Sequence, residues 1–201
     1  MIIKTERLVV RTFRDNDAEA LYMIKTDPKV QEFCPDFLDI DAKEEDMRSY
    51  IRLFQSIEKA LDIDTWRCFA IENRENGVVM GALTFSKQNM LHEYELGWMM
   101  IGKYTGKGYA SEAAQAFAEF FCRTHGIDYL IAVMDVDNPA SRRTAEKSGF
   151  RLFEKRTVYD HHCNRYCDDY YYFRRYSSDC KLKERYYGDS PYYGRSTSGG
   201  N

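Results

Sequence analysis

The 201-residue sequence contains no apolar run near the roughly 20 residues that a membrane-spanning helix needs. Its opening residues, MIIKTERLVV, also lack the long apolar stretch and the small-residue cleavage site of a signal peptide. Together these absences argue against a membrane-spanning or secreted protein. We therefore expect a cytoplasmic protein with no membrane partner.

An excess of positive charge is missing as well. The chain carries 29 lysine and arginine residues against 32 aspartate and glutamate residues, a formal net charge of -3, and its isoelectric point is near 5.9. Nucleic acids and anionic membranes recruit proteins with a clear excess of lysine and arginine. No nucleic-acid partner is expected, and the partner is predicted to be a small molecule or a peptide.

Cysteine is sparse, with six residues spread over a chain of ordinary domain size. Secreted disulfide scaffolds are short and dense in cysteine, whereas this spacing fits reduced thiols. Cys122 lies in an apolar helical pattern and is predicted to be a core residue, so nucleophilic cysteine chemistry is not expected.

Candidate metal ligands gather in one segment, DHHCNRYC, which contains His161, His162, Cys163 and Cys167. Structural zinc sites usually combine two ligand pairs from different segments, and here one short segment supplies them all. We therefore predict no metal and interpret the segment as a hairpin turn that could touch a substrate.

Hydrophobic periodicity predicts strands and helices interleaved along one mixed domain. Strand patterns cover residues 7–13, 65–72, 77–85, 92–100, 129–136, 150–159 and 168–176. Helical patterns cover residues 18–25, 47–61, 109–125 and 139–148. The order includes a meander of three strands between helices, so the predicted class is α/β (mixed α+β).

Composition changes near residue 177. Residues 1–176 are predicted to form the domain, and residues 177–201 read SSDCKLKERYYGDSPYYGRSTSGGN, poor in aliphatic residues and rich in glycine, serine and tyrosine. Such a segment buries too little apolar surface to fold by itself, so we predict a C-terminal tail outside the core fold. A tyrosine-rich contact segment is the alternative.

The stretch GKYTGKGYASEAAQ, residues 102–115, places two glycines and a lysine where an amphipathic helix begins. The first N–H groups of a helix have no partner inside it, and glycine lets a ligand approach closely, so such a turn can hold phosphate. A P-loop is excluded because Gly106 and Lys107 are followed by Gly108 rather than by serine or threonine.

A dinucleotide-binding turn is a second way to use these glycines. It would take Gly106 and Gly108, with Ser111 at the third glycine position and Asp135 or Asp137 as the acid for the ribose. An antiparallel-looking meander precedes the turn, however, where a dinucleotide fold would have βαβ units. A nicotinamide-dependent oxidoreductase is therefore the lesser alternative.

Four segments, in this order, resemble the GNAT N-acetyltransferase superfamily, in its branch of Rim-type ribosomal-protein N-terminal acetyltransferases. They are TERLVVRTFRDNDAEAL, EYELGWMMIGKYTGKGYASEA, NPASRRTAEKSGF and the final predicted hairpin. The resemblance implies the acyl-CoA N-acyltransferase fold, a central and mostly antiparallel mixed sheet of about six or seven strands flanked by about four helices.

The resemblance also implies acetyl-CoA as cosubstrate. The family motif Q/R-x-x-G-x-G/A falls on Thr105, Gly106, Lys107, Gly108, Tyr109 and Ala110, with threonine in place of the usual glutamine or arginine. Backbone N–H groups of residues 106–111, up to Ser111, and the helix dipole would hold the diphosphate. Lys107 is either a further phosphate contact or a solvated lysine, and Glu112 is expected only to favour the dipole.

In this family the central strand parts from its neighbour near the coenzyme loop. The resemblance assigns the freed backbone groups to Met99, Met100 and Ile101, which would pair with the pantetheine arm. An N–H group there would also stabilise the oxyanion that forms when the acetyl carbonyl is attacked.

Acetyl transfer to an amine needs a neutral nucleophile, whereas an α-amine has a pKa near 8 and a lysine amine near 10.4. A carboxylate close to the acetyl group can remove the proton, directly or through water. By resemblance this general base is Glu95, two residues before Gly97. Glu93 shares the same strand face and is the reserve candidate.

The leaving thiolate has an intrinsic pKa near 8.5, so a proton donor helps without being essential. Ala145 stands where many superfamily members have a tyrosine. The Rim-type resemblance implies Ser141 as the residue near the thiol and Asn138 as a contact to pantetheine or an organiser of the loop. An ordinary helix start at Asn138 and Pro139 is the alternative.

The sequence therefore predicts an acetyl-CoA-dependent N-acetyltransferase that moves acetyl directly to a primary amine, either a protein N-terminal α-amine or a small-molecule amine. A coenzyme-binding module without turnover is the alternative, favoured by Thr105 and Ala145. The acceptor and the oligomeric state, including a homodimer, are left open.

Overall fold

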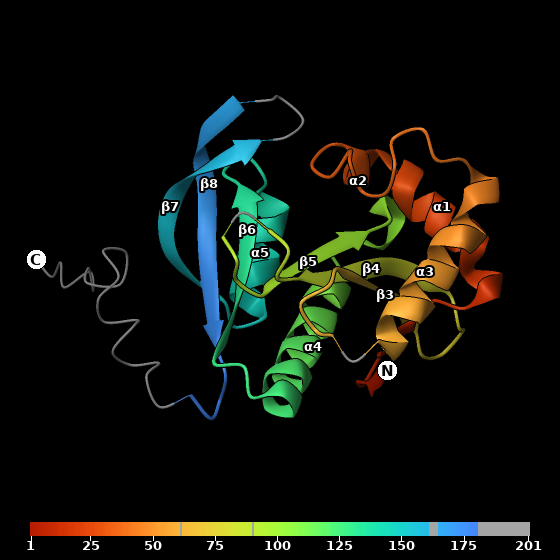
Figure 1. Cartoon of the computed structure of the whole chain (residues 1–201), viewed down its shortest axis with the longest axis horizontal. Coiled ribbons are helices and arrows are strands. Elements are labelled where there is room, and N and C mark those ends of the chain that lie inside the picture. Colours follow the sequence, from red (N-terminus) through yellow and green to blue (C-terminus); the bar gives the residue numbers. More distant parts are fainter. Residues whose placement is uncertain (61, 90, 161–164, 181–201) are drawn as a thin grey trace, which may run out of the picture.

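The computed structural model describes residues 1–60, 62–89, 91–160 and 165–180. In these residues eight strands form one sheet in the order β1-β2-β3-β4-β5-β6-β8-β7 (Figure 1). All neighbouring strands are antiparallel except β5 and β6, which are parallel. The strands are β1 (Ile2–Lys4), β2 (Leu8–Thr12), β3 (Arg67–Asn73), β4 (Val79–Ser86), β5 (Glu95–Met100), β6 (Tyr129–Asp135), β7 (Arg151–Asp160) and β8 (Arg165–Tyr176).

Five α-helices in the described ranges cover the sheet. They are α1 (Ala18–Thr26), α2 (Pro28–Gln31), α3 (Met47–Lys59), α4 (Tyr109–His125) and α5 (Pro139–Lys147). Three short 3-10 turns, η1 (Asp15–Asp17), η2 (Glu44–Asp46) and η3 (Gly102–Tyr104), lead into α1, α3 and the loop before α4. In Figure 1 the helices α1, α2 and α3 lie together on one side of β5, and α5 lies beside β6 on the other.

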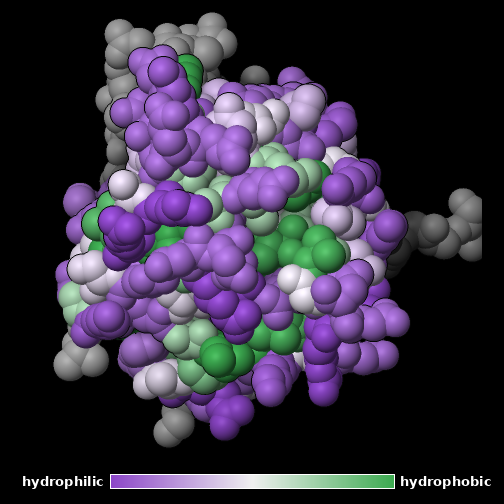
Figure 2. Space-filling model, turned by 90° about the vertical axis from the view of Figure 1, so that its right-hand side faces the viewer, coloured by the Kyte–Doolittle hydropathy of each residue, from purple (hydrophilic) through white to green (hydrophobic). Residues whose placement is uncertain are grey.

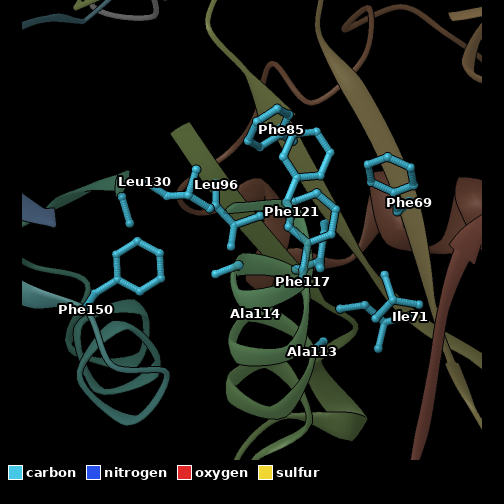
Figure 3. Close-up of a cluster of buried hydrophobic side chains, with 14 of the residues drawn as sticks. Phe69, Ile71, Phe85, Leu96, Ala113, Ala114, Phe117, Phe121, Leu130 and Phe150 are labelled. Carbon is cyan, nitrogen blue, oxygen red and sulfur yellow. The ribbon is translucent and has the colours of Figure 1, made fainter. Parts of the chain in front are cut away.

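The two faces of the sheet carry separate hydrophobic cores because side chains alternate along each strand. Phe69 of β3 belongs to the core under α4, whereas its neighbour Ala70 belongs to the core under α1 and α3. Figure 3 shows the first core, where Phe117 and Phe121 of α4 pack on Phe85 of β4. The sheet is thus the middle of three layers.

Helix α5 lies on the same face as α4. Its buried Ala145 and the following Phe150 belong to the α4 core, and Figure 3 shows Phe150 beside Leu130 of β6. The opposite face is covered by α1 and α3, whose outer surface is largely hydrophilic with separate hydrophobic patches (Figure 2). Ligands that approach the sheet from its two faces therefore meet different helices.

Helix α4 begins and ends at a glycine. Gly108 at its start and Gly126 at its end have φ values of 80° and 64°, a left-handed conformation that favours glycine. Ala113, Ala114 and Ala118 are fully buried, and their small side chains let the helix lie close to the sheet. The first turn of α4 is thereby held just beyond the end of β5.

The predicted fold class is confirmed, and each of the seven predicted strands is present. The additional strand, β1, was missed because it has three residues of which Ile3 alone is buried, too few for an alternating pattern. Strand β5 begins at Glu95 rather than at residue 92, since His92 has a positive φ of 52° and the Asn89 amide donates to the Glu93 carbonyl in a turn.

One additional helix, α2, also went unpredicted. The first helix was predicted to end at residue 25, and α1 ends at Thr26, just before the pair Asp27 and Pro28. The same pair then starts α2, because Pro28 suits the first helical position and the Asp27 carboxylate accepts the Lys29 N–H at 2.9 Å.

The packed domain extends to Cys180 rather than ending at Tyr176. Ser177 and Cys180 are buried, and the Ser177 N–H donates to the Asp128 carbonyl oxygen at 2.8 Å. The Ser178 hydroxyl donates to Glu119 at 2.8 Å. Polar composition hid these contacts from the sequence, and the remainder of the predicted tail, residues 181–201, lies outside the described residues.

Across the described ranges, no helix is both long enough and apolar enough to span a bilayer.

Candidate active site

The central feature of the site is the divergence of β5 from β6. Strand β4 pairs with β5 along its whole length, from Glu95 to Met100. On its other side β5 pairs with β6, within the described residues, at Glu95 and Ile131 alone, where the Ile131 N–H donates to the Tyr94 carbonyl oxygen at 2.8 Å. Beyond this point the two strands separate (Figure 1). The sheet therefore contains an unpaired strand edge in its interior.

The register decides which backbone groups of β5 lie on this open edge. Backbone groups of alternate residues point to the same side of a strand. The Tyr94 carbonyl points toward β6, whereas the Ile101 N–H points toward β4 and donates to the Met80 carbonyl at 3.0 Å. Trp98 and Met100 therefore present their N–H and C=O groups to the open edge.

The three residues predicted to bind pantetheine have different places in this register. Of the three, Met100 lies on the open edge and Met99 points its backbone groups toward β4. Ile101 donates its N–H to β4, and its carbonyl accepts the Tyr104 N–H at 2.8 Å. Trp98 is a further residue whose backbone groups lie on the open edge. The difference is one residue of register, which alternation along a single strand cannot fix because it depends on the pairing with β4.

The Trp98 side chain extends from this part of β5 into the core under α4 and carries one polar group. Its indole Nε1 is buried and has no hydrogen-bond partner among the described residues. The ring meets Phe150 edge-on at 6.0 Å between centroids. A buried N–H without a partner costs roughly 1–3 kcal/mol, so a ligand that accepts from it gains affinity.

The glycine turn lies next to the open edge and has the geometry of an anion cradle. Gly106 and Gly108 have φ values of 76° and 80°, and a side chain at Gly106 would meet no atom within 4 Å. No side chain of the described residues caps the first turn of α4, and its first bond runs from the Glu112 N–H to the Gly108 carbonyl. The N–H groups of Tyr109, Ala110 and Ser111 therefore have no partner within the helix.

Thr105 and Lys107 contribute differently to this turn. The Thr105 hydroxyl donates to the Gly102 carbonyl at 2.8 Å, so it closes the preceding 3-10 turn instead of pointing at a ligand. The Lys107 side chain is exposed. The open edge, the unpartnered indole N–H and the uncapped helix start together fit a ligand that carries both amides and phosphates, as coenzyme A does.

Glu95 lies at the closed end of the split, on the sheet face that α1, α2 and α3 cover. It is half-buried, and its Oε2 accepts from the Asn89 side-chain amide at 3.2 Å. Burial, with a smaller contribution from the Glu93 charge, raises the pKa of Glu95 to about 7. A carboxylate with this pKa can take a proton at neutral pH.

Comparison with known proteins decides the family. Residues 7–151 match the family model described as an acetyltransferase (GNAT) domain. The chain belongs to the GNAT acetyltransferase family. The dinucleotide-binding alternative is thereby excluded, in agreement with the antiparallel strands before the glycine turn.

Several relatives of this GNAT chain have similar length. It is 31% identical over 174 residues to a Bacillus subtilis (strain 168) protein described as an uncharacterized N-acetyltransferase, YnaD, covering 86% of this chain and 95% of that protein. A GNAT acetyltransferase from Bacillus anthracis has 29% identity and a TM-score of 0.71, covering 88% of this chain and 98% of its own. RimL, a ribosomal L7/L12 α-N-protein acetyltransferase solved with coenzyme A, shares the fold with 19% identity, a TM-score of 0.72, and coverage of 88% and 98%.

Asn138 and Ser141 open α5 on the other side of the split. The Asn138 side-chain oxygen accepts the Ser141 N–H at 2.9 Å, which makes Asn138 the N-cap of the helix. This contact supports the structural role that was the alternative for Asn138. Ser141 is half-buried and lies on the face of α4, opposite to the face of Glu95. The two predicted catalytic residues therefore lie on opposite faces of the sheet.

Glu93, the reserve candidate for the base, has a different environment. Its Oε1 accepts from the Tyr129 hydroxyl at 2.7 Å and from the Tyr172 hydroxyl at 2.6 Å. Both hydroxyls occupy Oε1, so this oxygen is already engaged by groups of β6 and β8. The Glu95 carboxylate, with one hydrogen bond from Asn89, has fewer side-chain donors than that of Glu93.

Arg7 is a site residue that the sequence did not reveal. Its guanidinium donates to the Lys107 carbonyl at 3.1 Å and lies over the Tyr109 ring at 4.7 Å from Cζ to the centroid, so it braces the glycine turn. Glu112 holds Arg7 in place. Burial opposes ionisation of Glu112, but hydrogen bonds from Thr5 and Arg7 outweigh it and lower the pKa of Glu112.

Of the metal-ligand types noted in the sequence, His161, His162 and Cys163 lie outside the described residues, and so does the side chain of Cys167. Cys122 lies on the buried face of α4, as predicted for a core residue, and burial raises the pKa of its thiol to about 12.

Proposed function

We propose that this GNAT acetyltransferase transfers the acetyl group of acetyl-CoA directly to a primary amine. The observation that carries the proposal is the position of Glu95, a carboxylate with a near-neutral pKa beside an unpaired strand edge. The amine nitrogen would form a bond to the thioester carbonyl carbon, and the bond from that carbon to sulfur would break. The amine proton would pass to Glu95 and the thiolate would take up a proton.

The chain's own residues divide the binding of acetyl-CoA between two elements. The N–H groups of residues 106–111 would hold the diphosphate at the start of α4. The backbone of Met100 and Trp98 would pair with the pantetheine amides, and the unpartnered Trp98 indole N–H offers one further donor. Bound in this way, acetyl-CoA supplies the activated acyl group.

Glu95 would act as the general base. An α-amine has a pKa of about 8, one unit above the pKa of Glu95, so proton transfer between them at neutral pH is nearly balanced. Coenzyme would be held from the α4 face and the amine would arrive from the α1 and α3 face, so Glu95 would meet the amine first. Glu95 either takes the proton directly or orients a water that does.

Ser141 would face the departing sulfur. A hydroxyl is a weak acid, and it acts best by relaying a proton or by donating a hydrogen bond to the thiolate. Ala145 is fully buried in the core, so it supplies no alternative donor.

The proposed acceptor is a protein N-terminal α-amine, with a small-molecule amine as the second class to test. Support comes from solved structures of the same fold, since RimL is described as an L7/L12 α-N-protein acetyltransferase and a Vibrio fischeri neighbour as a ribosomal-protein S5-alanine acetyltransferase. We infer a Rim-type enzyme on this basis.

The first experiment is a calorimetric titration of the full chain with acetyl-CoA, together with the variants Gly106→Glu and Gly77→Glu. Both glycines have positive φ and open space for a side chain, but Gly77 lies in the β3–β4 turn. A carboxylate at residue 106 should abolish binding by repelling the diphosphate, whereas Gly77→Glu should bind like the natural protein. No binding by the natural protein would contradict the proposal.

Turnover is tested by thiol release with a panel of peptides and small amines. Release with peptides that carry a free α-amine, and none with the same peptides acetylated at the N-terminus, supports the proposed acceptor. Binding of acetyl-CoA without release to any amine would select the alternative of a coenzyme-binding module.

A further inference from the structure

Glu93 lies at the closed end of the split and collects four donors from the far side of it. The hydroxyls of Tyr129 and Tyr172 donate to Oε1 at 2.7 and 2.6 Å. Arg174 approaches the same oxygen at 3.4 Å, and Arg156 lies 3.7 Å from Oε2. The Glu93 side chain is 16% exposed, so these contacts are largely shielded from solvent.

The four donors come from three different strands. Tyr129 begins β6, Tyr172 and Arg174 lie in β8, and Arg156 lies in β7. Glu93 itself stands in the turn that leads into β5. One carboxylate therefore joins the part of the sheet built on β1 to β5 to the part built on β6 to β8, at a point where β5 and β6 share a single pair of residues.

The charges and protons of this cluster make the junction firm. Burial and the bond to Glu93 raise the pKa of Tyr129 to about 12, and the same two causes raise the pKa of Tyr172 further, so both phenols remain protonated donors. Arg174 also donates through Nε to the Tyr172 hydroxyl at 2.8 Å. A shielded carboxylate with charge-assisted donors is costly to disrupt, because each group that loses its partner stays desolvated.

Glu93 is also adjacent to the residues that define the split. The next residue, Tyr94, accepts the Ile131 N–H in the last contact between β5 and β6, and Glu95 follows on the same strand face as Glu93. Glu93 is thus one residue from the bond that joins β5 to β6 and two residues from Glu95.

We propose that Glu93 is a positioning residue for acetyl transfer: it clamps β5 to β6 and β8 at the closed end of the split and so holds Glu95 against the open edge. The inference rests on the proposed function, in which Glu95 takes the proton of the amine. Glu93 itself contacts neither coenzyme nor acceptor in this scheme.

Several charged groups surround Glu95, and they bear on a test by pH. Glu93 shares its strand, the Cys34 thiol and the Asp36 carboxylate come from the segment between α2 and α3, and Arg156 and Arg174 lie beyond Glu93. Glu93 is the like charge that makes protonated Glu95 more favourable. Removal of its charge should shift the titration of Glu95 toward lower pH.

The test compares the full-length natural protein with Glu93→Gln and with Glu119→Gln as the matched control. Glu119 also pairs with an arginine of β8, Arg175 at 3.1 Å, but on the opposite face of the sheet. We would measure the Kd of acetyl-CoA by calorimetry, and kcat and kcat/KM for the best amine between about pH 5.5 and 9.

For Glu93→Gln we expect kcat to fall about tenfold while the Kd of acetyl-CoA changes by less than about threefold, because the helix start still holds the diphosphate. The acidic limb of the kcat/KM profile should move down by about half a pH unit, because one like charge near Glu95 is removed. Glu119→Gln should leave kcat and the profile unchanged.

A second variant keeps the test decisive if Glu93→Gln does not fold. Tyr129→Phe removes one donor from Glu93 and should lower kcat by about threefold at an unchanged Kd. In the double variant the loss should equal that of Glu93→Gln alone, because both changes break the same clamp. The inference would be overturned if folded Glu93→Gln had the kcat and pH profile of the natural protein. If Glu93→Gln does not fold, the same result in Tyr129→Phe would overturn it. Absence of transfer by the natural protein would instead overturn the proposed function.

Discussion

Arg7 and Glu112 stand 105 residues apart in the sequence, and their side chains meet at 2.6 Å between Nε and Oε2. Glu112 also accepts the Arg7 N–H at 3.0 Å, so the carboxylate holds both the backbone and the side chain of this arginine. Through the bond from Arg7 to the Lys107 carbonyl, the turn between β1 and β2 supports the glycine turn before α4.

The first prediction concerns this support. Arg7→Ala should raise the Kd of acetyl-CoA by about fivefold. Without Arg7 the glycine turn would be less ordered in the free protein, so part of the binding free energy would be used to order it. The free energy of unfolding should fall by no more than about 1 kcal/mol, because the ion pair is partly exposed. Calorimetry and urea unfolding measure the two effects.

Arg74→Ala is the matched control for Arg7. Arg74 donates to the Thr5 carbonyl of the same β1–β2 turn at 3.1 Å, and it has no described bond to the glycine turn. An equal loss of affinity in both variants would mean that the turn as a whole matters rather than the contact of Arg7 with Lys107.

The second prediction is a pH dependence. Burial raises the pKa of Glu95 to about 7, and the base must be ionised to accept a proton, so kcat/KM should rise with pH through about 7. Glu95→Gln should lower kcat by a factor on the order of 10² to 10⁴ and remove this limb from the profile. A limb that persists in Glu95→Gln would show that another group titrates there.

The third prediction links Glu95 to stability, and its sign is unusual for a carboxylate. The pKa of Glu95 is about 7 in the folded protein and 4.5 in the unfolded chain, so the folded protein binds this proton more tightly. The free energy of unfolding therefore falls as the pH rises from 4.5 to 7 and stays constant at higher pH. Glu95→Gln should therefore be more stable than the natural protein near pH 8, by on the order of 2 kcal/mol, and equally stable near pH 4. Urea unfolding at the two pH values measures the difference.

Glu119→Gln supplies a control of opposite sign. A hydrogen bond from Ser178, with further help from Arg175, lowers the pKa of Glu119, so the charged form stabilises the fold at neutral pH. This variant should be less stable than the natural protein near pH 8. The same direction of change in both variants would contradict the assignment of a raised pKa to Glu95.

The fourth prediction separates binding from folding at Trp98. Trp98→Phe removes a buried indole N–H that has no described hydrogen-bond partner, and this removal is stabilising. The smaller ring loses packing, which is destabilising, so the free energy of unfolding should change by less than about 1 kcal/mol. The Kd of acetyl-CoA should rise by about fivefold, the value of one hydrogen bond. Trp66→Phe is the control, because Trp66 packs on Phe54 under α3 and should leave the Kd unchanged.

Local patterns were enough to predict most of the fold. The strands β3 and β4 were predicted from the alternation of their side chains, and α4 from its own sequence pattern with small residues at its start. Each of these patterns lies within a single segment. Elements that depend on their neighbours were missed. Strand β1 exists because β2 pairs with it, and α2 is a single turn that packs Val30 into the core.

The candidate site shows the same division. The glycine turn was found because its signal is contiguous, whereas the choice between Met99 and Trp98 depends on the pairing of β5 with β4. The role of Glu93 could not be read from its neighbours in the chain, since Tyr172 is 79 residues away. Periodicity carries no information on such contacts, so only the folded structure distinguishes Glu93 from Glu95.

The open edge of β5 has a consequence for hydrogen exchange. Amides of Gly97 and Met99 point toward β4 and should exchange slowly. Those of Trp98 and Met100 have no strand partner in the part of the chain that the structure describes and should exchange far faster. Protection in the middle of the sheet should thus alternate from one residue to the next. Bound acetyl-CoA would pair with the open edge as a neighbouring strand does. It should slow the hydrogen exchange of the Trp98 and Met100 amides, so that all four amides become protected.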